Sequence, residues 1–248
     1  MKNKILLTGS TGKLGKRIIK NTHDISFLTP SSKDLDITSE ISIKRFFEEN
    51  SFSAIIHCAA LARMKECEEN PNKAFLINTL GTLNLVSKVR DIQKSLKKNI
   101  RFIYISTDGV YSCKDGNYSE DSPTIPYNIY GWSKLGGETS VRTLEDYCII
   151  RTRFFDPLNI PFNESADDII TSSIEIEKLV EIIYFLLNKE FTGVLNVGNK
   201  ESSEFLRYIA HKPNLEKCKR SDVKKNLKFE IAKNASMNIS LMKKIIKL

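Results

Sequence analysis

Residues 4–15 read KILLTGSTGKLG, and this stretch decides the fold. Its apolar start suits a buried strand, and three glycines follow before an amphipathic helical pattern over residues 14–21. Glycines at such places permit a tight turn, let the backbone approach a pyrophosphate and let helix and strand pack closely. The first turn of the helix then offers free N–H groups to phosphates. The stretch predicts a dinucleotide-binding strand, turn and helix, with an ordinary strand-to-helix turn as the alternative.

Short apolar runs alternate with longer amphipathic runs up to residue 153, which is typical of strand and helix units on a parallel sheet. Further strands are predicted at 25–28, 54–57, 101–105 and 147–151, with helices at 39–49, from 71 past 85, and at 128–144. The polar stretch 112–126 is predicted to be a surface loop. After residue 153 the pattern weakens to a helix at 175–187, a strand at 194–197 and helices near 203–210 and 239–248.

The predicted fold class is therefore α/β. A Rossmann-type doubly wound parallel sheet occupies residues 1–153, and a small, abbreviated C-terminal α/β lobe occupies residues 154–248. Some helices and one strand of the second segment are expected to pack on the sheet. The 248 residues suffice to bury a core of this kind.

Composition excludes several classes of protein. No apolar run approaches the roughly 20 residues of a membrane helix, and no signal-peptide pattern is present, so we expect a cytoplasmic protein without a membrane span. The five cysteines are widely spaced without a CxxC motif, which argues against a disulfide framework or a zinc site. His23, His57 and His211 form no ligand cluster, and no metal is predicted; a core position is expected for His57.

The region about 20 residues after the glycines indicates which cofactor binds. An acidic side chain there usually holds the ribose 2′-hydroxyl of NAD, but residues 29–33 read TPSSK and contain no carboxylate. Hydroxyls such as that of Ser31, together with an ammonium, could hold a 2′-phosphate, so NADP(H) is favoured and NAD(H) is the alternative. Asp34 or Asp36 would weaken this inference if the strand ended later. Asp36 and Ile37 are the candidates for a contact with the adenine edge.

Tyr130 and Lys134 lie four residues apart on a predicted helix and so share one face. An ammonium near the phenol would lower the Tyr130 pKa and make it a usable proton donor near neutral pH. The alternative is a solvated pair of side chains. Thr107 follows the preceding strand, where a parallel sheet presents its site, and could hydrogen-bond a substrate carbonyl. Ser106 could instead only cap that strand.

Seven motifs carry a resemblance to a known family. They are residues 8–15 (TGSTGKLG), 35–38 (LDIT), 57–60 (HCAA), 78–82 (NTLGT), 105–108 (ISTD), 130–138 (YGWSKLGGE) and 150–152 (IRT). In this order the chain resembles the extended short-chain dehydrogenase/reductase superfamily and, within it, the dTDP-4-dehydrorhamnose reductase group.

The resemblance implies NADPH-dependent reduction of a nucleotide-linked 4-keto-6-deoxy sugar, and dimers are common in the superfamily. Catalysis would rest on Thr107, Tyr130 and Lys134, with Tyr130 protonating the oxygen and Asn78 serving mainly as a structural hydrogen-bonder. The residues assigned to the cofactor are Gly9, Thr11, Gly12, Lys13, Leu14, Gly15, Ser31, Asp36, Ile37, Ala59, Ala60, Ser106, Tyr130 and Lys134. The residues assigned to the substrate are Thr107, Asp108 and Arg153.

Two positions depart from the resembled group. Gly109 stands where related dehydratases carry a glutamate, which argues against dehydration, and where the reductases often carry an aromatic residue. Residues 153–155 (RFF) stand where the group tends to have a tryptophan-containing segment. The alternatives are a 4-epimerase that retains NAD and a non-catalytic Rossmann-fold regulatory subunit.

The net charge of +8 comes from the end of the chain. Eleven basic and three acidic residues follow residue 210, so residues 1–210 are neutral overall. Because aromatic residues are not interleaved with these charges as in a nucleic-acid groove, no nucleic-acid partner is predicted. A solvated basic face is the default, and the sharper hypothesis is that some of these lysines, or Arg220, attract the diphosphate of a nucleotide sugar.

Overall fold

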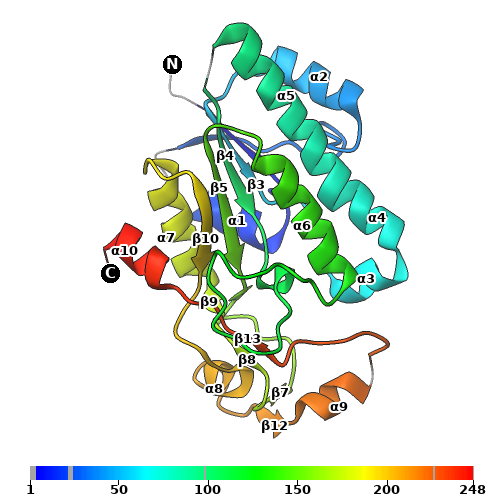
Figure 1. Cartoon of the computed structure of the whole chain (residues 1–248), viewed down its shortest axis with the longest axis vertical. Coiled ribbons are helices and arrows are strands. Elements are labelled where there is room, and N and C mark those ends of the chain that lie inside the picture. The colour runs from blue at the N-terminus through cyan, green and yellow to red at the C-terminus, as the bar shows by residue number, and fades with distance from the viewer. Residues whose placement is uncertain (1–3, 22–24, 98, 226, 248) are drawn as a thin grey trace.

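The computed structural model describes residues 4–21, 25–97, 99–225 and 227–247. Its main sheet is parallel throughout, and the apolar runs of the sequence form its strands (Figure 1). In spatial order the strands are β2 (Ser26–Leu28), β1 (Lys4–Thr8), β3 (Ala54–His57), β4 (Arg101–Ile105), β5 (Tyr147–Thr152) and β10 (Gly193–Val197). The strand order reverses between β1 and β3, which is where this class of sheet binds ligands. The predicted doubly wound α/β fold is confirmed.

Alternating side chains of each strand point to opposite faces and build two cores. On one face Ile5 and Leu7 pack with α1 (Lys13–Lys20), α7 (Ile176–Leu187) and α10 (Ser240–Ile246). On the other face Leu6 packs with α2 (Glu40–Glu49) and α5 (Gly81–Leu96), and α6 (Ile129–Val141) closes the end of this core. Both faces are covered, as expected for strands without a polar side.

One long helical segment contains a local irregularity that the pattern does not predict. The helix expected from residue 71 is divided into α4 (Pro71–Phe75), a π-helical turn η1 (Leu76–Leu80) and α5. The extra residue of a π turn turns the buried Asn78 toward the neighbouring segments. A short helix α3 (Met64–Glu69), also not predicted, precedes this segment. No described helix has the length and apolar character needed to cross a membrane.

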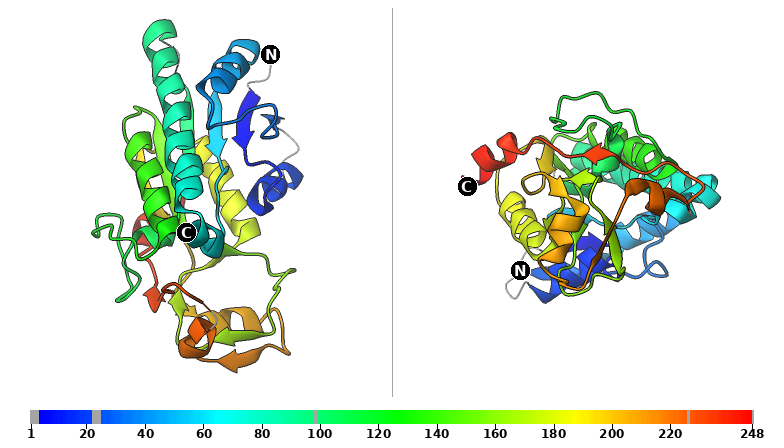
Figure 2. Two further views of the ribbon diagram at one scale, coloured as in Figure 1. Left: turned by 90° about the vertical axis from the view of Figure 1, so that its right-hand side faces the viewer. Right: turned by 90° about the horizontal axis from the view of Figure 1, so that it is seen from below.

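The segment after residue 153 contributes to two regions. Strand β10 is an edge strand of the main sheet, and helices α7 and α10 pack on that sheet. The other elements, here called the C-terminal lobe, lie beyond the carboxyl edge of the sheet (Figure 2). They are β7 (Glu164–Ala166), β8 (Ile170–Thr171), β11 (Ser202–Ser203), α8 (Glu204–Ile209), β12 (Glu216–Cys218), α9 (Arg220–Lys225) and β13 (Asn234–Ala235). Between them and the sheet, β6 (Phe154–Phe155) pairs with β9 (Ile174–Glu175).

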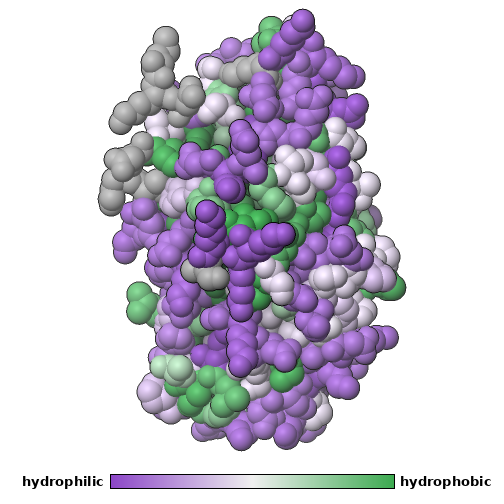
Figure 3. Space-filling view, turned by 60° about the vertical axis from the view of Figure 1, so that its left-hand side comes forward, coloured by the Kyte–Doolittle hydropathy of each residue, from purple (hydrophilic) through white to green (hydrophobic). Residues whose placement is uncertain are grey.

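Small cores hold the lobe together. Ala166, Ile169, Cys218 and Ile231 form one of them, between β7, β12 and the segment after α9. Hydrophilic side chains cover most of the face in Figure 3, and hydrophobic side chains gather at its lower end. Leu158, Phe162 and Leu206 are among the exposed apolar residues of the segment after residue 153. The lobe thus has a core of its own that is much smaller than those of the sheet.

The loop predicted at 112–126 is anchored rather than free on the surface. Tyr111 and Cys113 at its start are buried, and Tyr118 stacks on Tyr111 with ring centroids 4.8 Å apart. Tyr118 also forms a bridge to Met237, so the loop is tied to the returning C-terminal chain. The polar composition of the loop hid these aromatic anchors.

A buried ion pair joins β5 to α6. The Arg151 and Glu138 side chains are 1% and 0% exposed, and Arg151 Nη2 donates to Glu138 Oε2 at 2.7 Å. Ser106, after β4, donates to the other carboxylate oxygen at 2.5 Å, and Arg151 Nη1 donates to the Tyr111 hydroxyl at 2.8 Å. One pair of charges therefore ties together β4, β5, α6 and the 112–126 loop.

Replacing Arg151 with methionine is expected to lower the free energy of unfolding by about 3–5 kcal/mol, because Glu138 would be left buried without a countercharge. Urea denaturation measures this change. Lys225→Met is the control, since Lys225 and Asp222 form an exposed pair, and its effect should be far smaller. Equal losses in the two variants would show that the buried pair has no special role.

Candidate active site

The glycine-rich turn after β1 has the shape of a phosphate cradle. Gly9 has φ +69°, and a side chain there would meet the backbone N of Ala59 at 2.6 Å. A side chain on Gly15 would meet the carbonyl oxygen of Gly9 at 2.4 Å. Helix α1 has neither a side-chain cap nor an acidic residue in its first turn. Its N–H groups and dipole therefore suit an anion, and the residues present fit a dinucleotide pyrophosphate.

Other predicted residues of this turn have different surroundings. Thr11 and Lys13 are exposed beside the turn, whereas Leu14 is buried in the core below it. Gly12 N donates to the carbonyl oxygen of Gly9 at 3.0 Å, which closes the turn. Leu14 thus fixes the helix, and any contact of Leu14 with a phosphate would come from its backbone.

The segment after β2 brings a carboxylate to the expected ribose pocket. Asp34 accepts hydrogen bonds from the Ser31 backbone N at 3.0 Å and from the Ser31 hydroxyl at 2.6 Å, and these bonds lower the Asp34 pKa. Asp36 accepts from the backbone N and the hydroxyl of Thr38 within its own turn. Ile37 is buried and lies where a side chain on Gly81 would meet it. The sequence predicts a role for Asp34 only if the strand before it ends later. The structure shows that this exposed carboxylate is held on Ser31 after β2.

The ends of β1 and β3 meet beside the turn. Thr8 accepts a hydrogen bond from Ala59 N at 3.3 Å, and Ala60 follows, partly exposed, in the predicted floor. His57 is fully buried, with Nδ1 2.6 Å from the Thr8 hydroxyl and Nε2 3.0 Å from the Thr82 hydroxyl. Burial lowers the His57 pKa to about 3, so the ring stays neutral. The predicted core role of His57 is confirmed.

No group of three His, Cys, Asp or Glu side chains in the described part of the chain could hold a metal ion. His23 lies outside the described residues. Asn78, on the π turn, accepts from Leu61 N at 2.8 Å and donates to Ser133 Oγ at 2.8 Å. It thereby joins the segment after β3 to α6, as the resemblance implied for a structural residue.

Helix α6 carries Tyr130 and Lys134. Asn128 caps the helix by accepting from Gly131 N at 2.7 Å. A side chain on Gly131 would meet the carbonyl oxygen of Gly109 at 2.2 Å, so the start of α6 lies against the segment after β4. This close approach brings Tyr130 to the carboxyl edge of the sheet.

The environment of these two groups differs from the expectation. Burial raises the Tyr130 pKa, Asp108 and Cys67 raise it further, and the Thr107 hydroxyl and the charge of Arg153 act in the opposite direction. The prediction of a lowered Tyr130 pKa is therefore wrong: spacing places an ammonium on the same helix face but says nothing about burial. Lys134 is itself 2% exposed, and burial lowers its pKa to about 7. Its ammonium lies 4.0 Å from the centroid of the Tyr104 ring.

The end of β4 supplies the remaining predicted groups. Thr107 is buried, its hydroxyl accepts from Gly109 N at 3.1 Å, and it donates to Asp108 Oδ1 at 3.2 Å. The hydroxyl of Ser106 is instead engaged with Glu138. Of the two, Thr107 is the one whose hydroxyl lies beside Tyr130.

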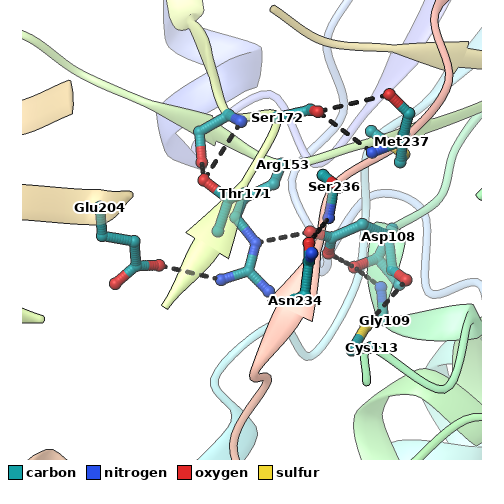
Figure 4. A network of polar contacts seen from close by, with 12 residues as sticks. Asp108, Gly109, Cys113, Arg153, Thr171, Ser172, Glu204, Asn234, Ser236 and Met237 are labelled. Atoms are coloured by element: carbon teal, nitrogen blue, oxygen red, sulfur yellow. Dashed lines mark hydrogen bonds and ion pairs between the residues drawn. The ribbon is translucent and has the colours of Figure 1, made fainter. Parts of the chain in front are cut away.

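Arg153 lies between the sheet and the C-terminal lobe. Its Nε donates to Asp108 Oδ2 at 2.6 Å, and its Nη1 donates to Glu204 Oε1 at 3.3 Å (Figure 4). Glu204 is the first residue of α8, and sequence reasoning missed it because nothing in its local pattern marks it. Arg153 and Asp108, both predicted on the substrate side, are thus bound to each other.

The predicted basic residues of the lobe largely have partners within it. Arg220 donates to the carbonyl oxygens of Ile231 and Ala232 and pairs with Glu230. Lys219 pairs with Asp167 at 2.8 Å. The guanidinium of Arg220 therefore stabilises the lobe itself.

Comparison with known proteins places this geometry in a family. Residues 2–155 match the RmlD substrate binding domain. The chain belongs to the RmlD substrate binding domain family.

This RmlD family member is similar both to a named reductase and to a named subunit of another enzyme. A Streptomyces niveus dTDP-4-keto-6-deoxy-D-glucose reductase is 29% identical over 74% of the chain and 61% of its own length. A Xenopus laevis methionine adenosyltransferase 2 subunit beta is 32% identical over 55% of the chain and 42% of its own length. The chain thus spans about two fifths to three fifths of these curated relatives.

A solved structure resembles the whole chain. The Bacillus anthracis dTDP-4-dehydrorhamnose reductase in complex with NADP has a TM-score of 0.86 and 24% identity, covering 98% of this chain and 92% of its own. This likeness confirms the RmlD-type fold, including the C-terminal lobe. The predicted resemblance to the reductase group is confirmed at the level of family and fold.

Because the pKa of Lys134 is lowered in the folded protein, the free energy of unfolding should depend on pH. Unfolded lysine titrates at its ordinary pKa of 10.5 and folded Lys134 at about 7, so above pH 7 the unfolded chain holds more protons and stability rises with pH. From pH 7 to 8.5 the wild type should gain stability relative to Lys134→Met by up to about 1.4 kcal/mol per pH unit. Urea denaturation across this range measures the difference.

The exposed Lys65 provides the control, because Lys65→Met should show no such trend. A difference between the wild type and Lys134→Met that stays flat over the range would mean that Lys134 is fully charged in the folded protein.

Proposed function

We propose that this protein is an NADPH-dependent reductase of a nucleotide-linked 4-keto-6-deoxy sugar. The observation that carries the proposal is that the Thr107 hydroxyl lies beside Tyr130, with Lys134 one turn further along α6. The sheet whose β4 precedes Thr107 also carries the glycine-rich turn, after β1. The reductase relative supports the same substrate class.

The side chains have complementary roles in this reaction. When bound, the nicotinamide supplies the hydride that the carbonyl carbon receives. Tyr130, whose raised pKa keeps it protonated at neutral pH, donates its hydroxyl proton to the carbonyl oxygen. The Thr107 hydroxyl, whose one hydrogen points to Asp108 Oδ1 in this structure, would turn from Asp108 to donate to the same oxygen. Lys134, with a pKa of about 7, holds a proton one helical turn from Tyr130 and can restore it.

The proposed donor is tested by Tyr130→Phe. Loss of the hydroxyl should lower kcat by about 10²–10⁴-fold, because the carbonyl oxygen would lack its proton source. The measurement is the loss of NADPH absorbance with dTDP-, UDP- and GDP-linked 4-keto-6-deoxy sugars.

Tyr147→Phe is the matched control, since Tyr147 begins β5 at the opposite end of that strand. Unchanged oxidation in Tyr130→Phe would show that another group donates the proton. No oxidation by the wild type with any of these sugars would reject the reductase function itself.

NADP(H) is the proposed cofactor, and Asp34 sets how strongly it is preferred. The residues before Asp34 offer hydroxyls and Lys33 to a 2′-phosphate, whereas the Asp34 carboxylate, held on Ser31, opposes it by charge. Asp34→Asn should raise the ratio of NADPH to NADH affinity several-fold, which isothermal titration of both cofactors measures. A ratio that stays constant or falls would mean that this carboxylate does not face the 2′-position.

A second candidate is a non-catalytic subunit, favoured by the likeness to the methionine adenosyltransferase subunit. It predicts NADPH binding without turnover of any keto sugar. Retained NAD and turnover without added cofactor would instead indicate the 4-epimerase.

A cytoplasmic location and a homodimer complete the proposal. The five free cysteines fit a reducing compartment. Exposed apolar side chains on η1, α5 and α6, such as Leu80, Leu83 and Trp132, support a second copy as partner. Light scattering of the purified chain tests the homodimer.

A further inference from the structure

Arg153 connects two carboxylates that belong to different parts of the molecule. It directly follows β5, and its backbone carbonyl accepts from Ile174 N at 2.9 Å, which fixes the backbone where β6 begins. The side chain reaches back to Asp108 at the end of β4 and forward to Glu204 on α8 (Figure 4). The Asp108 and Glu204 side chains are only 3% and 19% exposed, so water screens these charges weakly.

The same guanidinium lies beside both segments that carry catalytic groups. Asp108, which it holds through Oδ2, accepts the Thr107 hydroxyl through Oδ1. Burial raises the pKa of Tyr127, and the charge of Arg153 opposes that rise, so this phenol is also close. Tyr127 precedes Asn128, the cap of the helix that bears Tyr130.

Such a fork of donors is a feature of arginine in particular. Its five N–H groups are held in one plane, so it can bind two carboxylates in fixed directions, whereas a lysine ammonium acts as a single point charge. Two of the five N–H groups of Arg153 are engaged by Asp108 and Glu204, which fixes the plane of the guanidinium. Its geometry suits holding protein groups in place.

We infer that Arg153 is a positioning residue through which the C-terminal lobe sets the placement of Thr107 and Tyr130. This inference rests on the proposed reductase function. Glu204 is the residue of the lobe that contacts Arg153. Its backbone N donates to Ile169 O at 2.9 Å, and Ser203 caps α8 by accepting from Leu206 N at 3.2 Å. Helix α8 is therefore fixed to the rest of the lobe. Arg153 links Glu204 on this helix to Asp108, and Asp108 contacts Thr107.

Two variants separate this role from simple stability. Glu204→Gln keeps the shape of the side chain but removes its charge, and Arg153→Lys keeps the charge but loses the fork. In each, kcat for keto-sugar reduction should fall about tenfold or more, because small misplacements of reacting groups are costly. The KM for NADPH should stay the same, since neither residue contacts the glycine-rich turn. Glu201→Gln, an exposed acid three residues before Glu204, is the control and should match the wild type.

A second measurement does not require turnover. The Gly109 amide donates to Thr107 Oγ1 and the Gly131 amide donates to Asn128 Oδ1, so each reports on one catalytic segment. Exchange of these two amide hydrogens should be faster in Glu204→Gln than in the wild type and unchanged in Glu201→Gln.

The outcomes separate the two proposals. If wild-type protein reduces a keto sugar but Glu204→Gln and Arg153→Lys retain its kcat, the inference is overturned, even where their melting temperatures fall. If the wild type reduces no keto sugar, the reductase function fails, and exchange at Gly109 and Gly131 alone decides whether Arg153 transmits the position of the lobe. Unchanged exchange at both amides would then reject it.

Discussion

The ion pair between Arg151 and Glu138 is the constraint on which the candidate active site depends. Both charges are buried, so each would be strongly destabilising without the other. Glu138 is on α6, one turn after Lys134, and it also accepts a hydrogen bond from the hydroxyl of Ser106 at the end of β4. The contacts of Glu138 therefore hold β5, the end of β4 and α6 together through buried polar groups. The position of Tyr130 and Lys134 relative to Thr107 follows from that arrangement.

Arg153 forms further ion pairs, and one of them reaches the lobe. Arg151 lies in β5, and Arg153 directly follows the end of that strand. Arg151 binds the carboxylate of α6, and Arg153 binds the carboxylate beside Thr107. The first pair is fully enclosed and fixes the framework, whereas the second is partly exposed and includes Glu204 from the lobe. Both ion pairs are thus made from the end of β5 and the residue that follows it.

The sequence predicts those features that depend on local pattern. The strand, glycine turn and helix of residues 4–20 can be predicted because tight turns and buried strands need particular residues at particular spacings. The contact of Arg153 with Glu204 spans 51 residues, and no local pattern predicts it. The pKa values of Tyr130 and Lys134 were equally beyond prediction, because spacing reveals which groups are neighbours but not how deeply they are buried. The π turn that directs Asn78 inward also lacks a signal of its own.

Charged side chains of the C-terminal lobe form ion pairs with one another. Close contacts such as Lys219 with Asp167 and Arg220 with Glu230 satisfy part of the positive charge and hold short strands and α9 in place. Over the lobe strands and helices (residues 164–171 and 202–235) nine basic residues stand against seven acidic ones, so their charges nearly balance. Three of the basic residues after residue 210, Lys243, Lys244 and Lys247, lie instead in or directly after α10 on the main sheet. At the carboxyl edge of the sheet, Asp108 and Glu204 are likewise bound to Arg153. The charges of the lobe and of this edge therefore act mainly on one another, and they hold the lobe to the sheet.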